Sequence, residues 1–265
     1  MSIAANDEQG GYRPELEQWF GTALGQMLLA QETRWISNCL ETAFGYYLLQ
    51  LSALVGPDLA QGSHIRHRYR LAPGGLTCAH GSALSRYEAL PFPSSSVDVV
   101  ILHHVLEFSQ QPHQVLREAH RVLMPQGLLL VICINPWSLF GLRTRLLARF
   151  RPATWQGHSI GAGRMLDWMS LLDFRSSPLR QGFHHLPVQS PALLRRLDPL
   201  WQAAERVSAP GGGVYFIEAR KQVTSLTPTR MQRPRWRAWR PDLIPVGAAK
   251  GAAKGAANAS NFHAD

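Results

Sequence analysis

Two adjacent histidines followed by a glutamate are the side chains in this sequence best suited to acid–base chemistry. His103 and His104 come directly after the apolar stretch Val97–Leu102, and Glu107 follows a few residues later. An imidazole has an unperturbed pKa of about 6.5, so a neutral histidine can take a proton from a hydroxyl group or a ring nitrogen. His104 is therefore a candidate catalytic base, and His103 is expected to contact a ligand or to pack in the interior.

Close pairs of histidines also raise the question of a metal site. The chain has 11 histidines, and the pairs are His64/His67, His103/His104 and His184/His185. None of these pairs has a cysteine or a carboxylate at the spacing typical of metal ligands. The cysteines, Cys39, Cys78 and Cys133, are odd in number and widely separated, which argues against a zinc site and a disulfide framework. We therefore predict no metal, and the cysteines indicate a reducing, cytoplasmic environment.

The elements that must position the histidine pair form a strand–helix–strand unit. Val97–Leu102 is rich in β-branched residues, and Leu128–Ile134 is apolar throughout, as in parallel strands covered on both faces. Between them, Pro112–Met124 carries apolar residues along one helical face. Pro125 and Gly127 are expected to end this helix.

The remaining elements extend this unit into a larger α/β domain. Helices are predicted at Pro14–Phe20, Leu24–Leu40, Leu142–Phe150, Met165–Leu172 and Pro191–Val207. Further strands are predicted at Tyr46–Leu51, Ile65–Leu71, Leu76–Ala79 and Val214–Ala219. Arginines alternate along Ile65–Leu71, so that strand is expected either at the sheet edge or with one solvated face.

The length and composition bound the domain organisation. With 265 residues and 45% hydrophobic residues, the chain can bury one core of ordinary size. We predict a disordered N-terminus over residues 1–12, a domain over residues 13–221 and a disordered basic tail over residues 222–265. No apolar run approaches the roughly 20 residues that span a bilayer, so no membrane span is expected.

Much of the net charge of +9 belongs to the tail, which has seven Lys and Arg residues against two Asp. The body of the chain is therefore only mildly basic. Arginines next to Trp236 and Trp239 could bind a nucleic-acid backbone while the indole rings stack on bases. The alternative is a solvated tail without a specific partner.

Four segments in order carry a family resemblance: Leu90–Pro93, Val97–Val100, His104–Glu107 and Arg121–Gly127. Together they resemble the central half of class I S-adenosylmethionine-dependent methyltransferases of the small-molecule, type 11-like branch. Asn135–Gly141 resembles a segment of an uncharacterised proteobacterial subgroup. The resemblance implies a Rossmann-like, seven-stranded, mostly parallel sheet with an antiparallel last strand and helices on both faces.

The resemblance also implies where S-adenosylmethionine would bind, although this chain departs from the family pattern. The glycine-rich motif after the first strand retains only Gly56, with Gln50 in place of the acid and Leu54 where its side chain could occupy cofactor space. No acidic residue ends the second strand. The expected cofactor-binding residues are Gln50, Leu51, Ser52, Gly56, Glu88, Ala89 and His103. A substrate pocket is expected at Asn135 and Trp137, where an indole in a loop either packs or lines the pocket.

The resulting functional prediction is methyl transfer from S-adenosylmethionine to an unidentified, small-molecule acceptor. The degenerate motif leaves a second possibility, a non-catalytic protein that keeps the fold and acts as a binding or regulatory module. A third possibility is an RNA methyltransferase held to its substrate by the basic tail. Neither the acceptor atom nor the oligomeric state follows from the sequence.

Overall fold

The structure is a computed structural model that describes residues 13–72, 75–78, 81–83, 86–139, 141–142, 157–158, 160–184 and 211–222. Its helices are α2 (Pro14–Phe20), α3 (Ala23–Leu40), α4 (Val105–Phe108), α5 (Pro112–Val122) and α7 (Ala162–Leu171). Its strands are β1 (Tyr47–Ser52), β2 (His67–Ala72), β3 (Gly75–Cys78), β4 (Gly81–Ala83), β5 (Val97–His103), β6 (Leu123–Ile134), β7 (Phe174–Ser176), β8 (Arg180–Gly182) and β9 (Val214–Lys221). The predicted helix at Pro191–Val207, almost all of the one at Leu142–Phe150 and both predicted disordered termini lie outside the described residues.

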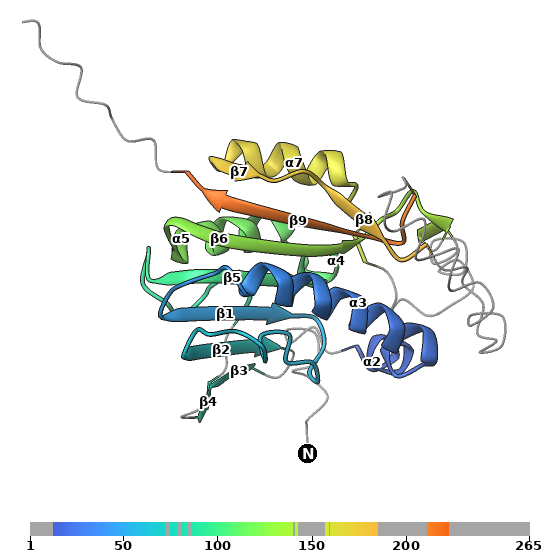
Figure 1. The fold of residues 1–265 in the computed structure, drawn as a ribbon, viewed down its shortest axis with the longest axis horizontal. Coiled ribbons are helices and arrows are strands. Elements are labelled where there is room, and N and C mark those ends of the chain that lie inside the picture. The colour runs from blue at the N-terminus through green and yellow to red at the C-terminus, as the bar shows by residue number, and fades with distance from the viewer. Residues whose placement is uncertain are drawn as a thin grey trace, which may run out of the picture. The chain divides into compact units, whose positions relative to one another are not determined.

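The described strands form one mixed sheet in the order β4-β3-β2-β1-β5-β6-β9-β7, with β8 also paired to β9 (Figure 1). β2, β1, β5 and β6 run parallel, whereas β9 is antiparallel to β6. The predicted α/β class and the antiparallel last strand are thus confirmed. The sheet has nine strands among the described residues, compared with the seven expected. β3 and β4 form a hairpin after β2, and the short strands β7 and β8 both pair with β9.

The second strand is flanked on both sides, so it is not the edge strand that its arginines suggested as one possibility. β1 pairs with one side of β2, and β3 pairs antiparallel with the other. The other possibility, a solvated face, agrees with the exposure of His67 and Arg68. β3 lies close to the predicted third strand but runs antiparallel to β2, and β4 continues the same hairpin.

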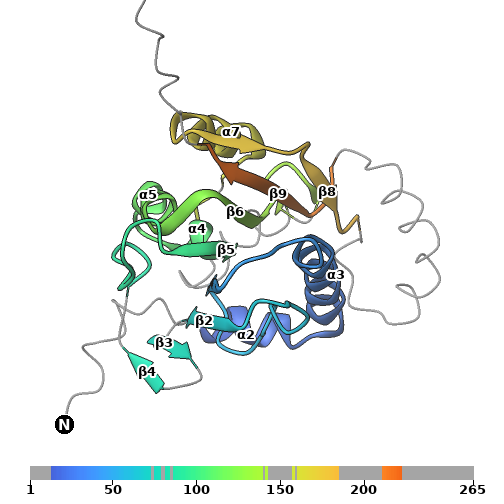
Figure 2. The same cartoon turned by 60° about the vertical axis from the view of Figure 1, so that its left-hand side comes forward.

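Helices cover both faces of the sheet, as the continuous apolar strands predicted (Figure 2). Alternate residues of β5 point to opposite sides: Val100 and Leu102 pack with α5 and α7, whereas Val99 and Ile101 pack with α3. α5 ends at Val122, before the proline and glycine expected to stop it, because the backbone of Leu123 is already extended. β6 consequently begins earlier than predicted.

α2 and α3 extend from the face of the sheet that α3 covers and reach over the edge where the parallel strands end (Figure 1). The Thr22 side chain caps α3 by accepting a hydrogen bond from the Gly25 amide at 3.2 Å, so the chain turns sharply between α2 and α3. A third apolar cluster joins both helices to the loop after β1, and it includes Leu16, Phe20, Leu24, Leu28, Ala53 and Leu54. Among the described residues, no helix is both long and apolar enough to cross a bilayer.

Candidate functional site

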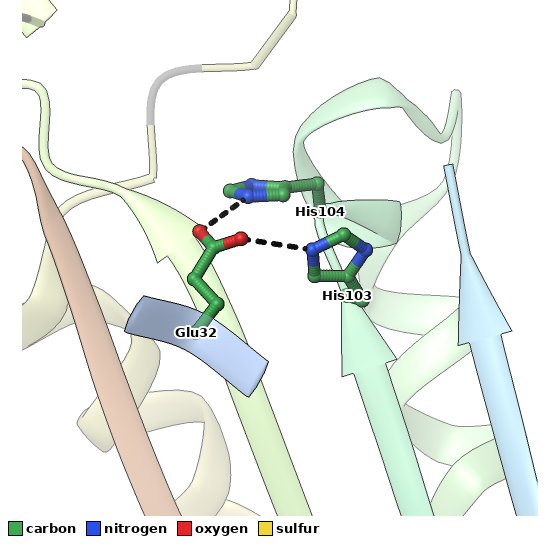
Figure 3. Close-up of side chains that lie close together, drawn as sticks. All are labelled: Glu32, His103 and His104. Atoms are coloured by element: carbon green, nitrogen blue, oxygen red, sulfur yellow. Dashed lines mark hydrogen bonds and ion pairs between the residues drawn. The ribbon is translucent and has the colours of Figure 1, made fainter. Parts of the chain in front are cut away.

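The histidine pair lies at the carboxyl end of β5, where it meets a carboxylate from α3. His103 continues the alternation of Val99 and Ile101, so its imidazole points toward α3. The Glu32 carboxylate lies 3.1 Å from His103 Nε2 through one oxygen and 2.9 Å from His104 Nε2 through the other (Figure 3). All three side chains are completely buried. Residues 71 positions apart in the sequence therefore form one polar cluster.

The opposite nitrogen of each imidazole also has a partner. Glu107 Oε2 lies 2.8 Å from His104 Nδ1, and the other oxygen of Glu107 accepts a hydrogen bond from the backbone amide of Ile134. Ser52 Oγ lies 3.0 Å from His103 Nδ1 and accepts a hydrogen bond from the Leu54 amide. Both rings are thus fixed from two sides: β1 and α3 orient His103, and α3 and α4 orient His104.

The backbone at the second histidine is unusual. His104 has φ 55° and ψ 12°, in the left-handed region that residues with a side chain seldom adopt. Its amide donates a hydrogen bond to the carbonyl of Ile132 at 3.1 Å. The Phe20 ring packs against both imidazoles, with centroid distances of 6.2 Å to His103 and 5.6 Å to His104. Neighbouring elements therefore hold this strained residue in place.

Electrostatics divide the two histidines into different protonation states. Burial opposes a charge on His104, but the carboxylates of Glu32 and Glu107 outweigh it and raise the His104 pKa well above its usual value. Burial is the largest influence on His103 and lowers its pKa. Burial opposes the charge of Glu32 too, yet His104 and the hydrogen bonds from both imidazoles lower the Glu32 pKa. His104 is thus a cation donating to two carboxylates, without a free lone pair in this arrangement.

Gln50, which replaces the acid of the cofactor motif, has a structural partner at each end of its amide. Its Nε2 donates to the carbonyl of Pro57 at 2.7 Å, and its Oε1 accepts from the amide of Leu59 at 2.9 Å. The buried side chain therefore braces the turn after β1. Leu51 points to the opposite face of the sheet, into the core beneath α5.

The loop after β1 has one closed and one open side. Leu54 is only 1% exposed and packs in the cluster that joins α2 and α3 to this loop. The Glu17 side chain of α2 accepts a hydrogen bond from the Val55 amide at 2.5 Å. Gly56 is exposed, and a Cβ built on it would meet no atom within 4 Å. Gly56 thus lies on the exposed side of this loop, and Leu54 lies on its buried side.

Glu88 and Ala89, two of the expected cofactor-binding residues, lie in the segment before β5. Glu88 Oε1 accepts a hydrogen bond from Ser109 Oγ at 2.6 Å, and Ala89 is exposed. The Tyr87 hydroxyl donates to the carbonyl of Ser52 at 2.7 Å. The segment before β5 is therefore attached to the end of β1, as a cofactor that contacts both would require.

Asn135 and Trp137 occupy different environments. Asn135 is buried, its Nδ2 donates to the carbonyl of Gly212 at 3.0 Å, and its Oδ1 accepts from the Trp137 amide at 3.1 Å. The Trp137 side chain is 82% exposed, so it does not pack in the core. Asn135 shapes the loop after β6, and the indole remains accessible.

The sequence reasoning missed Glu32, which joins the histidine pair into one site. A signal was present, because buried residues recur every fourth position along α3: Leu24, Leu28, Glu32, Ile36 and Leu40. A single carboxylate in the middle of an apolar stripe indicates a buried partner, since unpaired buried charges are costly.

Sequence and structure comparisons with known proteins agree with this α/β fold. Residues 40–131 match the methyltransferase domain family. Over this segment the chain is similar to S-adenosylmethionine-dependent methyltransferases. It is 29% identical over 170 residues to the uncharacterised protein YafS of Escherichia coli (strain K12), covering 64% of this chain and 69% of that protein.

Solved structures extend the similarity in fold beyond the matched segment. A SAM-dependent methyltransferase from Thermotoga maritima superposes with a TM-score of 0.52 at 16% identity, covering 79% of this chain and 96% of the other. A SAM-dependent methyltransferase from Archaeoglobus fulgidus gives 0.52 at 14% identity, with 78% and 99% covered. At these identities the superpositions establish a shared fold.

Proposed function

We propose that this chain binds S-adenosylmethionine where β1 and β5 end and transfers its methyl group to a small-molecule acceptor. The observation that carries the proposal is that β1 and β5 run parallel and end side by side at Ser52 and His103. In open α/β sheets, ligands bind outside the carboxyl ends of the parallel strands. The Thermotoga maritima structure is described as a possible histamine N-methyltransferase, which supports a small acceptor.

The transfer would be a direct displacement. A lone pair of the acceptor forms the new bond to the methyl carbon, the carbon–sulfur bond breaks, and S-adenosylhomocysteine leaves. Catalysis would come mainly from holding the two reactants in line. The prediction that His104 is a general base requires that its imidazolium first loses a proton and that the Glu32 or Glu107 carboxylate moves away, because both nitrogens contact carboxylates. Otherwise His104 is a buried cation paired with Glu32 and Glu107.

A second candidate, a non-catalytic binding module, is supported by the same loop. Gln50 has structural partners at both ends, and Glu17 of α2 takes the Val55 amide. β2 ends at Ala72 and Pro73 follows it, so no carboxylate at this position could accept hydrogen bonds from a ribose. Missing charge-assisted hydrogen bonds cost about 1.5–3 kcal/mol, so we expect about tenfold to hundredfold weaker cofactor binding than in relatives with the full motif.

A large side chain at position 56 should block the cofactor without harming the fold. Gly56→Phe introduces its ring into open space, so we expect an unchanged melting temperature and at least about tenfold weaker binding of S-adenosylhomocysteine by calorimetry. Gly163→Phe is the matched control, because Gly163 on α7 also has no atom within 4 Å of an added Cβ. Wild-type protein that gives no heat with either S-adenosylmethionine or S-adenosylhomocysteine at millimolar concentration would favour the non-catalytic module.

The basic tail is expected to act separately from this site. Truncation after Gln222 should leave the melting temperature and the S-adenosylhomocysteine affinity unchanged, because residues 223–265 have a composition that does not build a core. If the tail binds RNA, its five arginines predict a slope of about −3.5 for log affinity against log salt, and truncation should remove it. Equal and weak RNA retention by both proteins at low salt would contradict a role in RNA methylation.

A further inference from the structure

We propose that Glu32, His103 and His104 form a binding site for one divalent transition-metal ion, with zinc the best match. One ligand atom from each side chain lies within 4.8 Å of the other two, and all three residues are buried. The inference does not depend on S-adenosylmethionine binding. It differs from the expectation drawn from the sequence, because the carboxylate comes from a helix far from the histidine pair.

The donor set selects the class of ion. Each Nε2 atom faces a different oxygen of Glu32, so two imidazole nitrogens and one carboxylate converge on the same region (Figure 3). Magnesium and calcium prefer oxygen ligands, whereas zinc binds imidazole and carboxylate together. Reactive zinc sites usually have three protein ligands and a fourth position for water or another ligand.

The surroundings of the two rings match those of metal-bound histidines. Such a histidine usually directs its second nitrogen to a carboxylate, a carbonyl or another acceptor, which fixes the ring and its tautomer. Glu107 takes this position on His104 Nδ1, and Ser52 Oγ takes it on His103 Nδ1. The Ile134 amide and the Leu54 amide in turn hold these two partners. The left-handed backbone of His104 adds a strained residue to the same site.

Two carboxylates, Glu32 and Glu107, contact the histidine pair in a buried position. Buried charged groups in proteins are paired or coordinate metal ions, so a divalent cation also fits this cluster. Histidine ligands must be neutral, so metal binding would replace the protons between Glu32 and the two Nε2 atoms.

Metal binding by tag-free, full-length protein tests the proposal. After dialysis against EDTA, zinc titration followed by elemental analysis should give one zinc per chain, and cobalt(II) should produce the visible absorption of a four-coordinate site. Glu32→Gln should lower zinc affinity at least about 100-fold, because it replaces an anionic ligand with an amide. Glu107→Gln should lower it about 10- to 100-fold through His104. His64→Gln, which changes an exposed histidine outside the cluster, should bind zinc as the wild type does.

Circular dichroism in metal-free buffer establishes whether each variant folds. If Glu32→Gln fails to fold, Glu107→Gln and Ser52→Ala still separate a metal site from a hydrogen-bond network. Wild-type protein without stoichiometric zinc, or folded cluster variants that bind zinc as tightly as His64→Gln, would overturn the proposal. Titration of the same samples with S-adenosylhomocysteine, with and without zinc, tests the proposed methyltransferase site separately.

Discussion

Replacing Glu32 by alanine in metal-free buffer should lower the free energy of unfolding by about 3–5 kcal/mol. The variant removes the shared acceptor of two buried imidazoles and leaves His104 with only Glu107 as a charged partner. His103 and His104 are both fully buried, so bulk solvent does not solvate the two imidazoles that lose this partner. Urea denaturation, fitted for both midpoint and slope, measures the difference.

Glu41→Ala provides the matched control for that experiment. Glu41 is the C-terminal cap residue of the same helix, α3, but it is exposed. Its replacement should change stability by no more than about 0.5 kcal/mol. A loss below about 1 kcal/mol for Glu32→Ala would mean that the two histidines do not depend on the carboxylate as the geometry indicates.

The centre of the sheet could be predicted because its sequence pattern and its environment agree. β5 and β6 are apolar at almost every position, and both faces of each strand are buried in the structure. α5 has one apolar face, and that face packs on the sheet. Local pattern and tertiary packing specify the same element here, so the strand–helix–strand unit follows from the residues alone.

The direction of β3 could not be predicted in the same way. A four-residue strand has the same alternation whether it runs parallel or antiparallel to its neighbour. Its direction depends on the connection, and only two residues, Pro73 and Gly74, separate it from β2. A connection this short permits a hairpin but is too short for a parallel crossover. The family resemblance implies a mostly parallel sheet and therefore did not indicate this antiparallel hairpin.

The candidate site was predicted only in part, because its partners are distant in sequence. Ser52 and His103 lie side by side where β1 and β5 pair, and the strand pattern was sufficient to place both at the carboxyl edge. Glu32 reaches that edge only because α3 crosses it, which depends on packing between elements. The role of Gln50 likewise required knowledge of the turn at Pro57 and Leu59.

Leu54 connects the loop after β1 with α2 and α3, so its truncation should loosen the loop and both helices. Leu54→Ala is expected to destabilise the protein by about 2–5 kcal/mol, because the lost methyl groups leave a cavity in a fully buried cluster. Thermal and urea unfolding measure this effect. Val55→Ala is the matched control, since the neighbouring side chain is 43% exposed and should matter by no more than about 0.5 kcal/mol.

The Leu54→Ala variant also tests whether the cover of α2 and α3 over the loop after β1 affects cofactor affinity. If Leu54 occupied cofactor space, as its place in the sequence suggests, a smaller side chain there would tighten S-adenosylmethionine binding. In the structure the side chain points into the cluster with Leu16 and Phe20, while the open space lies beside Gly56. We therefore expect cofactor affinity to stay the same or weaken in Leu54→Ala as α2 loosens. Affinity that rises by about tenfold would show that Leu54 obstructs the cofactor and that the helical cover must open for binding.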